Sequence, residues 1–316
     1  MGIGSAPIPL RRFNYKLVEA PMEGVLTNVD RDLQRRVNWS DQVQDEDSGM
    51  WMTTVNLMMR FANNSYHAVK FLAGDEPEDP RRKRNYMLVL PGINRQLLDL
   101  LFSLVYMLDD FPARCVDYQR SGWREFHNEY GHTYSHFGTD PAWERYLDGL
   151  QQVLDRWEGP CRITQAEKND PKLIPYWKTP YQLQKMATKS QDYLKYLNTW
   201  IYGDISAQAH LSFGGLLKAT PMLLAEIVGG QRQEEVESRV VPQYHFQQIS
   251  RTAIVTLAIA TEIDSYFRLG NGEPILMLWN VFGEWVVEAK EMYEKRYQSL
   301  LEKVNPATAP GSSRAT

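Results

Sequence analysis

Residues 202–212 read Tyr-Gly-Asp-Ile-Ser-Ala-Gln-Ala-His-Leu-Ser, and three polar side chains recur there at every fourth position, as Tyr202, Ser206 and His210. Side chains four positions apart lie one above another on the same face of an α-helix. The spacing therefore predicts a helix that presents a phenol, a hydroxyl and an imidazole in one column. We expect the rest of the chain to be organised around this column.

The stretch from Ile93 to Leu108 is strongly apolar. Leucine or valine occupies positions 97, 98, 100, 101, 104, 105 and 108. A helix that is apolar on most sides is typical of the centre of a helical protein. We therefore expect this stretch to form the central helix of a bundle. The segment Trp51–Ala73 also repeats its apolar residues with the period of a helix.

Helical patterns cover most of the remaining chain. We expect further helices over Val25–Val37, Asp109–Glu129, Ala142–Trp157, a segment from Thr179 onward, Gln247–Leu269 and Pro274–Val304. The motif Gly270-Asn271-Gly272 predicts a tight turn between the last two of these helices. Only Arg239–Val241 suggests a strand. The sequence thus predicts an all-α fold, a multi-helix bundle with long C-terminal helices.

Composition divides the chain into three parts. Residues 1–48 open with Gly, Ser and Pro and end in an acidic segment, which predicts a loose N-terminal arm and a linker. Residues 49–304 contain the strong helical patterns and are expected to form one helical domain. Residues 305–316 are rich in Pro, Ala and Ser and are expected to be disordered.

The composition also limits the class of protein. The net charge of −4 does not favour nucleic acid as a general partner, although it leaves room for a local basic patch. Two cysteines are too few for a disulfide scaffold and are consistent with a reducing compartment. No apolar segment has the length of a signal peptide or a membrane span. We therefore expect a soluble, cytoplasmic protein that does not contact a membrane.

The expected central helix contains an opposite-charge pair, Arg95 and Asp99, four positions apart. Such a pair is either a solvated surface contact or, in apolar surroundings, a partly buried pair that needs further partners. The column at Tyr202, Ser206 and His210 offers such partners. Hydrogen bonds between the two helices would then make either a structural network or a functional site, and the sequence leaves both interpretations open.

The Tyr-x3-Ser-x3-His spacing, together with Arg95, Asp99 and Trp177, resembles an uncharacterised bacterial family, domain of unknown function 5677. Asp99 stands where that family usually has Glu, and Leu211 where it often has Pro. The resemblance implies an HEPN-like helical architecture, which is associated with defence and toxin systems. Many HEPN proteins are metal-independent ribonucleases with an Arg-x4–6-His motif.

Three Arg–His pairs have that spacing, namely Arg60 with His67, Arg120 with His127, and Arg239 with His245. None has Asn, Asp or His directly after the arginine, as the active enzymes usually do. His210 has no arginine at this spacing, so Arg95 would have to reach it through the fold. His210 would then accept the proton of the ribose 2′-hydroxyl, and Arg95 would stabilise charge on the phosphorus centre.

The resemblance makes Tyr202, Ser206, His210, Arg95 and Asp99 the candidate catalytic residues. We weigh two functions. The first is an HEPN-like protein of the defence or toxin type, with RNA as its partner. The second is a non-catalytic helical interaction module that binds a protein partner or a second copy of itself, and in which the same residues are structural. The sequence leaves open whether the protein is an enzyme.

Other chemistry has weaker support in the sequence. His132 and His136 have the spacing of a two-histidine zinc face, with His127 nearby, but Gly131 and Gly138 favour a loop. We expect no metal site, because zinc needs three or four converging ligands, and no cofactor, because the chain has no Gly-x-Gly-x-x-Gly or P-loop motif. The pair Ser206 and His210 lacks the Gly-x-Ser-x-Gly elbow of hydrolases.

Overall fold

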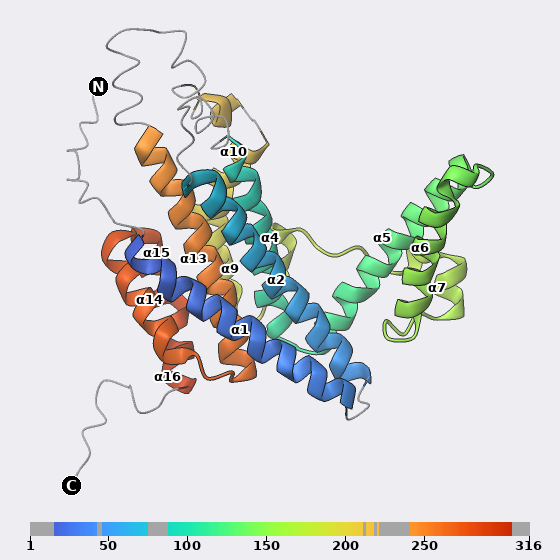
Figure 1. The fold of residues 1–316 in the computed structure, drawn as a ribbon, viewed down its shortest axis with the longest axis horizontal. Helices are drawn as coiled ribbons and strands as arrows, with labels where there is room; N and C mark the ends of the chain where they lie inside the picture. The colour runs from blue at the N-terminus through green and yellow to red at the C-terminus, as the bar shows by residue number, and fades with distance from the viewer. Residues whose placement is uncertain are drawn as a thin grey trace.

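The computed structural model describes residues 16–42, 46–74, 88–210, 213–217, 220 and 241–304, and within these ranges all regular secondary structure is helical (Figure 1). The predicted all-α, multi-helix class is thus confirmed. No helix in these ranges is long and apolar enough to cross a membrane. The predicted tail at 305–316 and most of the suggested strand lie outside the described residues, while Val241 begins a helix.

The first helices along the chain are α1 (Lys16–Gln42), α2 (Glu46–Gly74), α4 (Leu90–Leu108), α5 (Ala113–Phe137), α6 (Pro141–Glu158), α7 (Gln165–Asn169), a 3₁₀ turn (Pro171–Leu173) and α8 (Pro180–Met186). They are followed by α9 (Gln191–Tyr196), a π-helix (Leu197–Tyr202), α10 (Gly203–Ala209), α13 (Val241–Phe267), α14 (Gly272–Trp285), α15 (Val287–Met292), a second π-helix (Tyr293–Tyr297) and α16 (Gln298–Val304).

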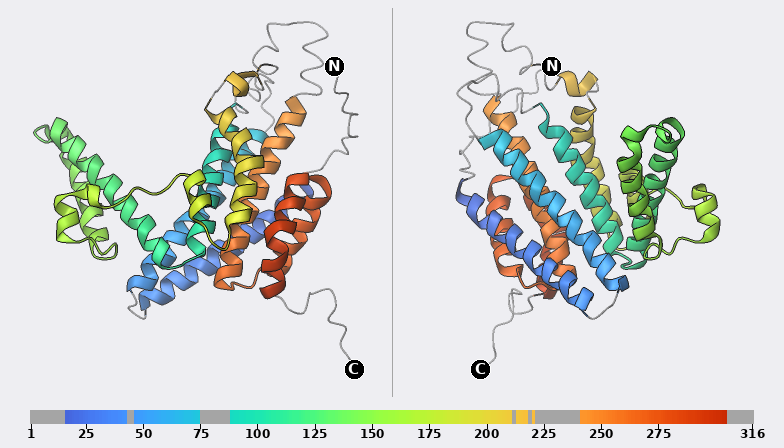
Figure 2. Two further views of the ribbon diagram at one scale, coloured as in Figure 1. Left: turned by 180° about the vertical axis from the view of Figure 1, so that it is seen from behind. Right: turned by 45° about the vertical axis from the view of Figure 1, so that its right-hand side comes forward.

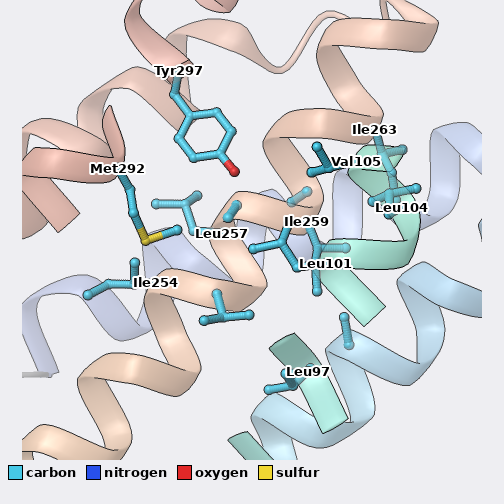
Figure 3. Packing of buried hydrophobic residues seen from close by; sticks show 14 of the residues in the cluster. Leu97, Leu101, Leu104, Val105, Ile254, Leu257, Ile259, Ile263, Met292 and Tyr297 are labelled. Carbon is cyan, nitrogen blue, oxygen red and sulfur yellow. The ribbon is translucent and has the colours of Figure 1, made fainter. Parts of the chain in front are cut away.

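The core of the bundle lies where α4 and α13 cross. In Figure 3, Leu101 of α4 lies near Ile259 of α13, and Leu104 lies near Ile263; all four side chains are buried. Helix α2 packs against both α4 and α13. Burial of this many aliphatic side chains supplies the main driving force for folding. The expectation that the apolar stretch from Ile93 onward is the central helix is confirmed.

The N-terminal segment differs from its prediction. The short helix expected over Val25–Val37 extends to 27 residues, from Lys16 to Gln42. Its inner face belongs to the main core through seven side chains, Val18, Met22, Val25, Leu26, Val29, Leu33 and Val37. These apolar residues recur every three or four positions, as an amphipathic helix requires. The loose arm predicted over residues 1–48 is therefore wrong for residues 16–42, while residues 1–15 lie outside the described part.

Helices α5 to α7 leave the bundle as a lateral hairpin, residues 113–173 (Figures 1 and 2). The hairpin has a small core of its own, made of Trp123, Leu154, Cys161, Ile163 and Ile174. The indole of Trp123 also donates a hydrogen bond to the carbonyl of Leu154. Helix α6 confirms the prediction over Ala142–Trp157, and the side chain of Asp140 caps its N-terminus.

Asp109 has a different role from the expected one. The helix expected from Asp109 begins only after Pro112, as α5, and it has no side-chain cap. The carboxylate of Asp109 instead accepts hydrogen bonds from the backbone N–H groups of Lys189 and Ser190 and from the Ser190 hydroxyl. This contact holds the break between α8 and α9, so the long helix expected from Thr179 is interrupted.

Candidate functional site

The guanidinium of Arg95 is the centre of a polar network between α4 and the helix that follows the first π-helix. Its Nη1 donates to the Ser206 hydroxyl at 2.9 Å, and its Nη2 donates to the Tyr202 hydroxyl at 2.8 Å. Its Nε lies 3.6 Å from the Asp99 carboxylate. The structure thus brings Arg95, Asp99, Tyr202 and Ser206 together, and we call these four residues the Arg95 network.

Local helix geometry explains why the network forms. Tyr202 ends the π-helix and Ser206 lies four residues later in α10, so both side chains share one face. The adjoining face is fixed by Ile201 and Ile205, which are buried in the main core. The ring of Tyr202 packs edge-on against Phe102 of α4, with ring centroids 5.7 Å apart. Apolar packing on one side therefore orients the polar groups on the other.

Asp99 is the electrostatically unusual member of the network. Burial raises its pKa above the usual value, and hydrogen bonding from Tyr202 and the charge of Arg95 oppose this shift. Although 40% of the side chain is exposed, its Oδ1 atom is shielded from solvent and has no hydrogen-bond partner in the described residues. Burial and the neighbouring Asp99 charge raise the pKa of Tyr202 to about 12.

His210 stands apart from the other candidate residues. It caps the C-terminus of α10, where its backbone N–H donates to the Ser206 carbonyl at 3.0 Å. Its side chain is exposed, and its imidazole makes no hydrogen bond to the described residues that surround it. A positive charge on His210 would stabilise the Asp99 carboxylate. The imidazole is therefore within electrostatic reach of the network but is not bonded to it.

Trp177 contacts α4 at Ser103, one helical turn after Asp99. Its indole N–H donates to Ser103 Oγ at 2.9 Å, and Ser103 in turn donates to the Asp99 carbonyl. Its backbone N–H donates to Ser121 of α5 at 2.6 Å. Trp177 lies in the segment 174–179, which crosses from the lateral hairpin to the bundle (Figure 1). This tryptophan thus connects both parts of the molecule next to the network.

A cavity of about 820 Å³ opens beside Asp99 and Trp177, with walls formed by α2, α4, α5 and α6. Six aromatic side chains line it, Phe61, Tyr118, Trp123, Phe126, Trp157 and Trp177. Its lining carries two carboxylates, Asp99 and Glu125. We call it the aromatic cavity. The sequence interpretation missed it, because aromatic residues at helical spacing look the same in a core and in a cavity wall.

In the described part of the chain, no three or more His, Cys, Asp or Glu side chains converge to hold a metal ion, and this includes His127, His132 and His136. The loop favoured by Gly131 and Gly138 is wrong, because α5 continues to Phe137. His132 and His136 consequently stack on one exposed helix face, with ring centroids 4.4 Å apart. His127 packs against Trp123 instead.

The arginines of two Arg–His pairs are engaged elsewhere. Arg60 donates to Asp30 and Gln34 of α1. Arg120 binds Glu167, and it also donates to two backbone carbonyls of the lateral hairpin. Both guanidinium groups thus connect helices. The third pair begins at Arg239, which lies outside the described residues.

Comparison of the chain with protein-family models, with curated proteins and with solved structures finds no match. The resemblance to domain of unknown function 5677 and to HEPN proteins therefore stays a prediction. The function has to be argued from the geometry of the Arg95 network and of the aromatic cavity.

Proposed function

We propose that the protein is a non-catalytic helical binding protein in which the Arg95 network is structural. The observation that carries this proposal is that each of the three guanidinium nitrogens contacts a protein group. Arg95 donates to Ser206 and Tyr202 and forms an ion pair with Asp99. A cation held on three sides by protein groups joins α4 to α10, and a phosphate would have to compete with these groups for it.

The charge beside the network supports the same proposal. The aromatic cavity is lined by two carboxylates, and none of its described lining residues is Lys, Arg or His. Binding of a nucleic-acid backbone depends on basic side chains that neutralise phosphates. A cavity with acidic and aromatic walls is suited to a ligand other than RNA.

The exposure of His210 favours a second candidate, an HEPN-like protein that acts on RNA. His210 is accessible to a substrate and lies within electrostatic reach of Asp99. In this alternative His210 is the general base, and Arg95 must exchange its contacts with Tyr202 or Ser206 for a phosphate. This candidate therefore requires a rearrangement that the binding protein does not.

Expression of the wild type, Arg95→Ala and His210→Ala, with RNA integrity followed in the same cells, distinguishes the two functions. The exposed Arg145 supplies a matched control, Arg145→Ala. For a binding protein we expect no RNA cleavage with any variant, a lower Tm for Arg95→Ala and an unchanged Tm for His210→Ala. RNA cleavage by the wild type that is lost in both site variants, at equal protein levels, would overturn this proposal and establish a ribonuclease.

A further inference from the structure

The aromatic cavity has the size and the walls of a small-molecule site. Its volume of about 820 Å³ lies within the range of about 300–1,000 Å³ that holds drug-sized ligands. Its lining residues come from α2 and α4 of the bundle and from α5 and α6 of the lateral hairpin, with Trp177 between these two parts. Tryptophan side chains line it at positions 123, 157 and 177. Such rings favour an apolar ligand body and attract a cation over their faces.

A buried hydrogen-bond acceptor in the lining lacks a partner. Gln119 is only 7% exposed, and its Nε2 donates to the Met50 carbonyl and to Thr54 Oγ. Because the Met50 carbonyl accepts only, this contact fixes which end of the amide is the nitrogen. The Oε1 atom of Gln119 has no hydrogen-bond partner among the described residues. The Oε1 atom is shielded from solvent, so it adds the negative end of an amide dipole to the wall rather than a direct contact for a ligand.

A second buried acceptor in a lining residue also lacks a hydrogen-bond partner. The Oδ1 atom of Asp99 is buried and has no partner in the described part of the chain. Arg95 approaches the other carboxylate oxygen of Asp99. Glu125 adds a further carboxylate to the lining. None of the described residues that line the cavity has a basic side chain. The cavity thus offers acceptors and negative charge but no positive charge.

We propose that the aromatic cavity binds a small organic ammonium ion, a protonated primary or secondary amine on an aromatic or aliphatic body. The ammonium N–H groups donate to the carboxylates of Asp99 and Glu125, and the positive charge complements these carboxylates. The apolar body packs against the aromatic walls. A quaternary ammonium has no N–H donor, and an anionic ligand meets the carboxylates. This inference rests on the proposed binding function, because it names the class of ligand.

Calorimetric titration of the full chain with phenethylamine and tryptamine tests the proposal. The matched probes are 2-phenylethanol, which is neutral, and the N,N,N-trimethyl derivative of phenethylamine, which has the charge without the donors. We expect both amines to bind, and the neutral and trimethylated probes to bind about tenfold more weakly or not at all, since each lacks a charge or a donor. Equal binding of phenethylamine and 2-phenylethanol, or no binding of either amine, overturns the proposal.

Two substitutions locate the ammonium group. Asp99→Asn and Glu125→Gln remove charge with little change in shape, and Asp148→Asn is the control on an exposed position of α6 outside the lining. We expect Asp99→Asn to weaken amine binding about tenfold and Asp148→Asn to leave it unchanged. Unchanged binding by a folded Asp99→Asn variant overturns the assignment. If that variant does not fold, the four-probe comparison on the wild type and Glu125→Gln decide.

A lysine side chain of another protein carries the same ammonium group. A capped lysine peptide is therefore titrated in parallel, and tighter binding of the peptide than of the free amines overturns the small-molecule assignment. The ligand proposal and the proposed non-catalytic function can be overturned independently of each other. If no amine binds while Arg95→Ala still lowers Tm without an effect on RNA, the ligand class is wrong and the non-catalytic assignment stands.

Discussion

The Nη2 atom of Arg95 donates a 2.8 Å hydrogen bond to the hydroxyl of Tyr202, across 107 positions of the chain. The guanidinium carbon also lies 5.2 Å from the centre of the tyrosine ring, within the range of a cation–π contact. One pair of side chains thus joins the central helix to the end of the first π-helix by two kinds of interaction. Substitution of either residue is therefore expected to lower the stability of the protein.

Tyr202→Phe tests the hydrogen bond without removing the ring. The substitution takes away the acceptor of Arg95 Nη2, while the contact with Phe102 remains. We expect the free energy of unfolding to fall by about 1.5 kcal/mol, the size of a hydrogen bond to a charged group. Urea unfolding measures the change, and the exposed Tyr181→Phe is the control. Equal stability of the two variants would show that the hydroxyl is dispensable.

The lowered pKa of Glu167 indicates how the stability of the lateral hairpin depends on acid. Hydrogen bonds from Thr164 and the charge of Arg120 lower the pKa of Glu167 below its usual value of 4.5. A carboxyl with a depressed folded pKa stabilises the protein above its unfolded pKa, and this stabilisation is lost as the pH falls through the folded pKa. We therefore expect Tm to decrease below a pH of about 4.5.

Glu167→Gln separates this carboxyl from the others that titrate in acid. The variant should have a lower Tm than the wild type at neutral pH, and the difference should shrink as the pH falls below 4.5. Circular dichroism melting at several pH values gives both quantities, with Asp148→Asn as the control on an exposed part of α6. A difference in Tm that does not depend on pH would contradict the role of the Glu167 charge.

The two thiols are expected to react slowly in the native protein. Burial raises the pKa of Cys115 to about 12 and that of Cys161 to about 11, and the thiolate is the reactive form. Cys161 belongs to the small core of the hairpin and Cys115 to the main core. Because the smaller core buries less apolar surface, we expect Cys161 to be labelled first as urea increases. Mass spectrometry of alkylated protein gives the order, and earlier labelling of Cys115 would contradict it.

The main features of the fold could be predicted because they are local. The apolar run from Leu97 to Leu108 indicates a central helix from its own residues. The same logic failed where local signals point to a loop, as at Gly131, since a helix supported by neighbouring packing tolerates a glycine. The N-terminal helix was predicted too short, although its apolar period continues back to Val18.

The site could be predicted only in part. Helical spacing places Tyr202 and Ser206 on one face, and the structure adds that Arg95 reaches both. The aromatic cavity depends on how the lateral hairpin leaves the bundle, which no local pattern encodes. The unpartnered Oε1 atom of Gln119 likewise results from the packing of α5 against α2, which the sequence does not reveal.

The π-helix from Leu197 to Tyr202 gives this region a tolerance for changes in length. A π-turn closes its hydrogen bond over five residues, and an α-turn closes it over four. Loss of one residue, such as the exposed Thr199, would convert the turn to an α-turn and leave the phase of α10 unchanged. Ser206 would still face Arg95, and the deletion variant should keep nearly the Tm of the wild type in a melting experiment. A deletion inside α10 has no extra residue of a π-turn to compensate for it. Such a deletion would rotate the rest of α10 by about 100° relative to Arg95.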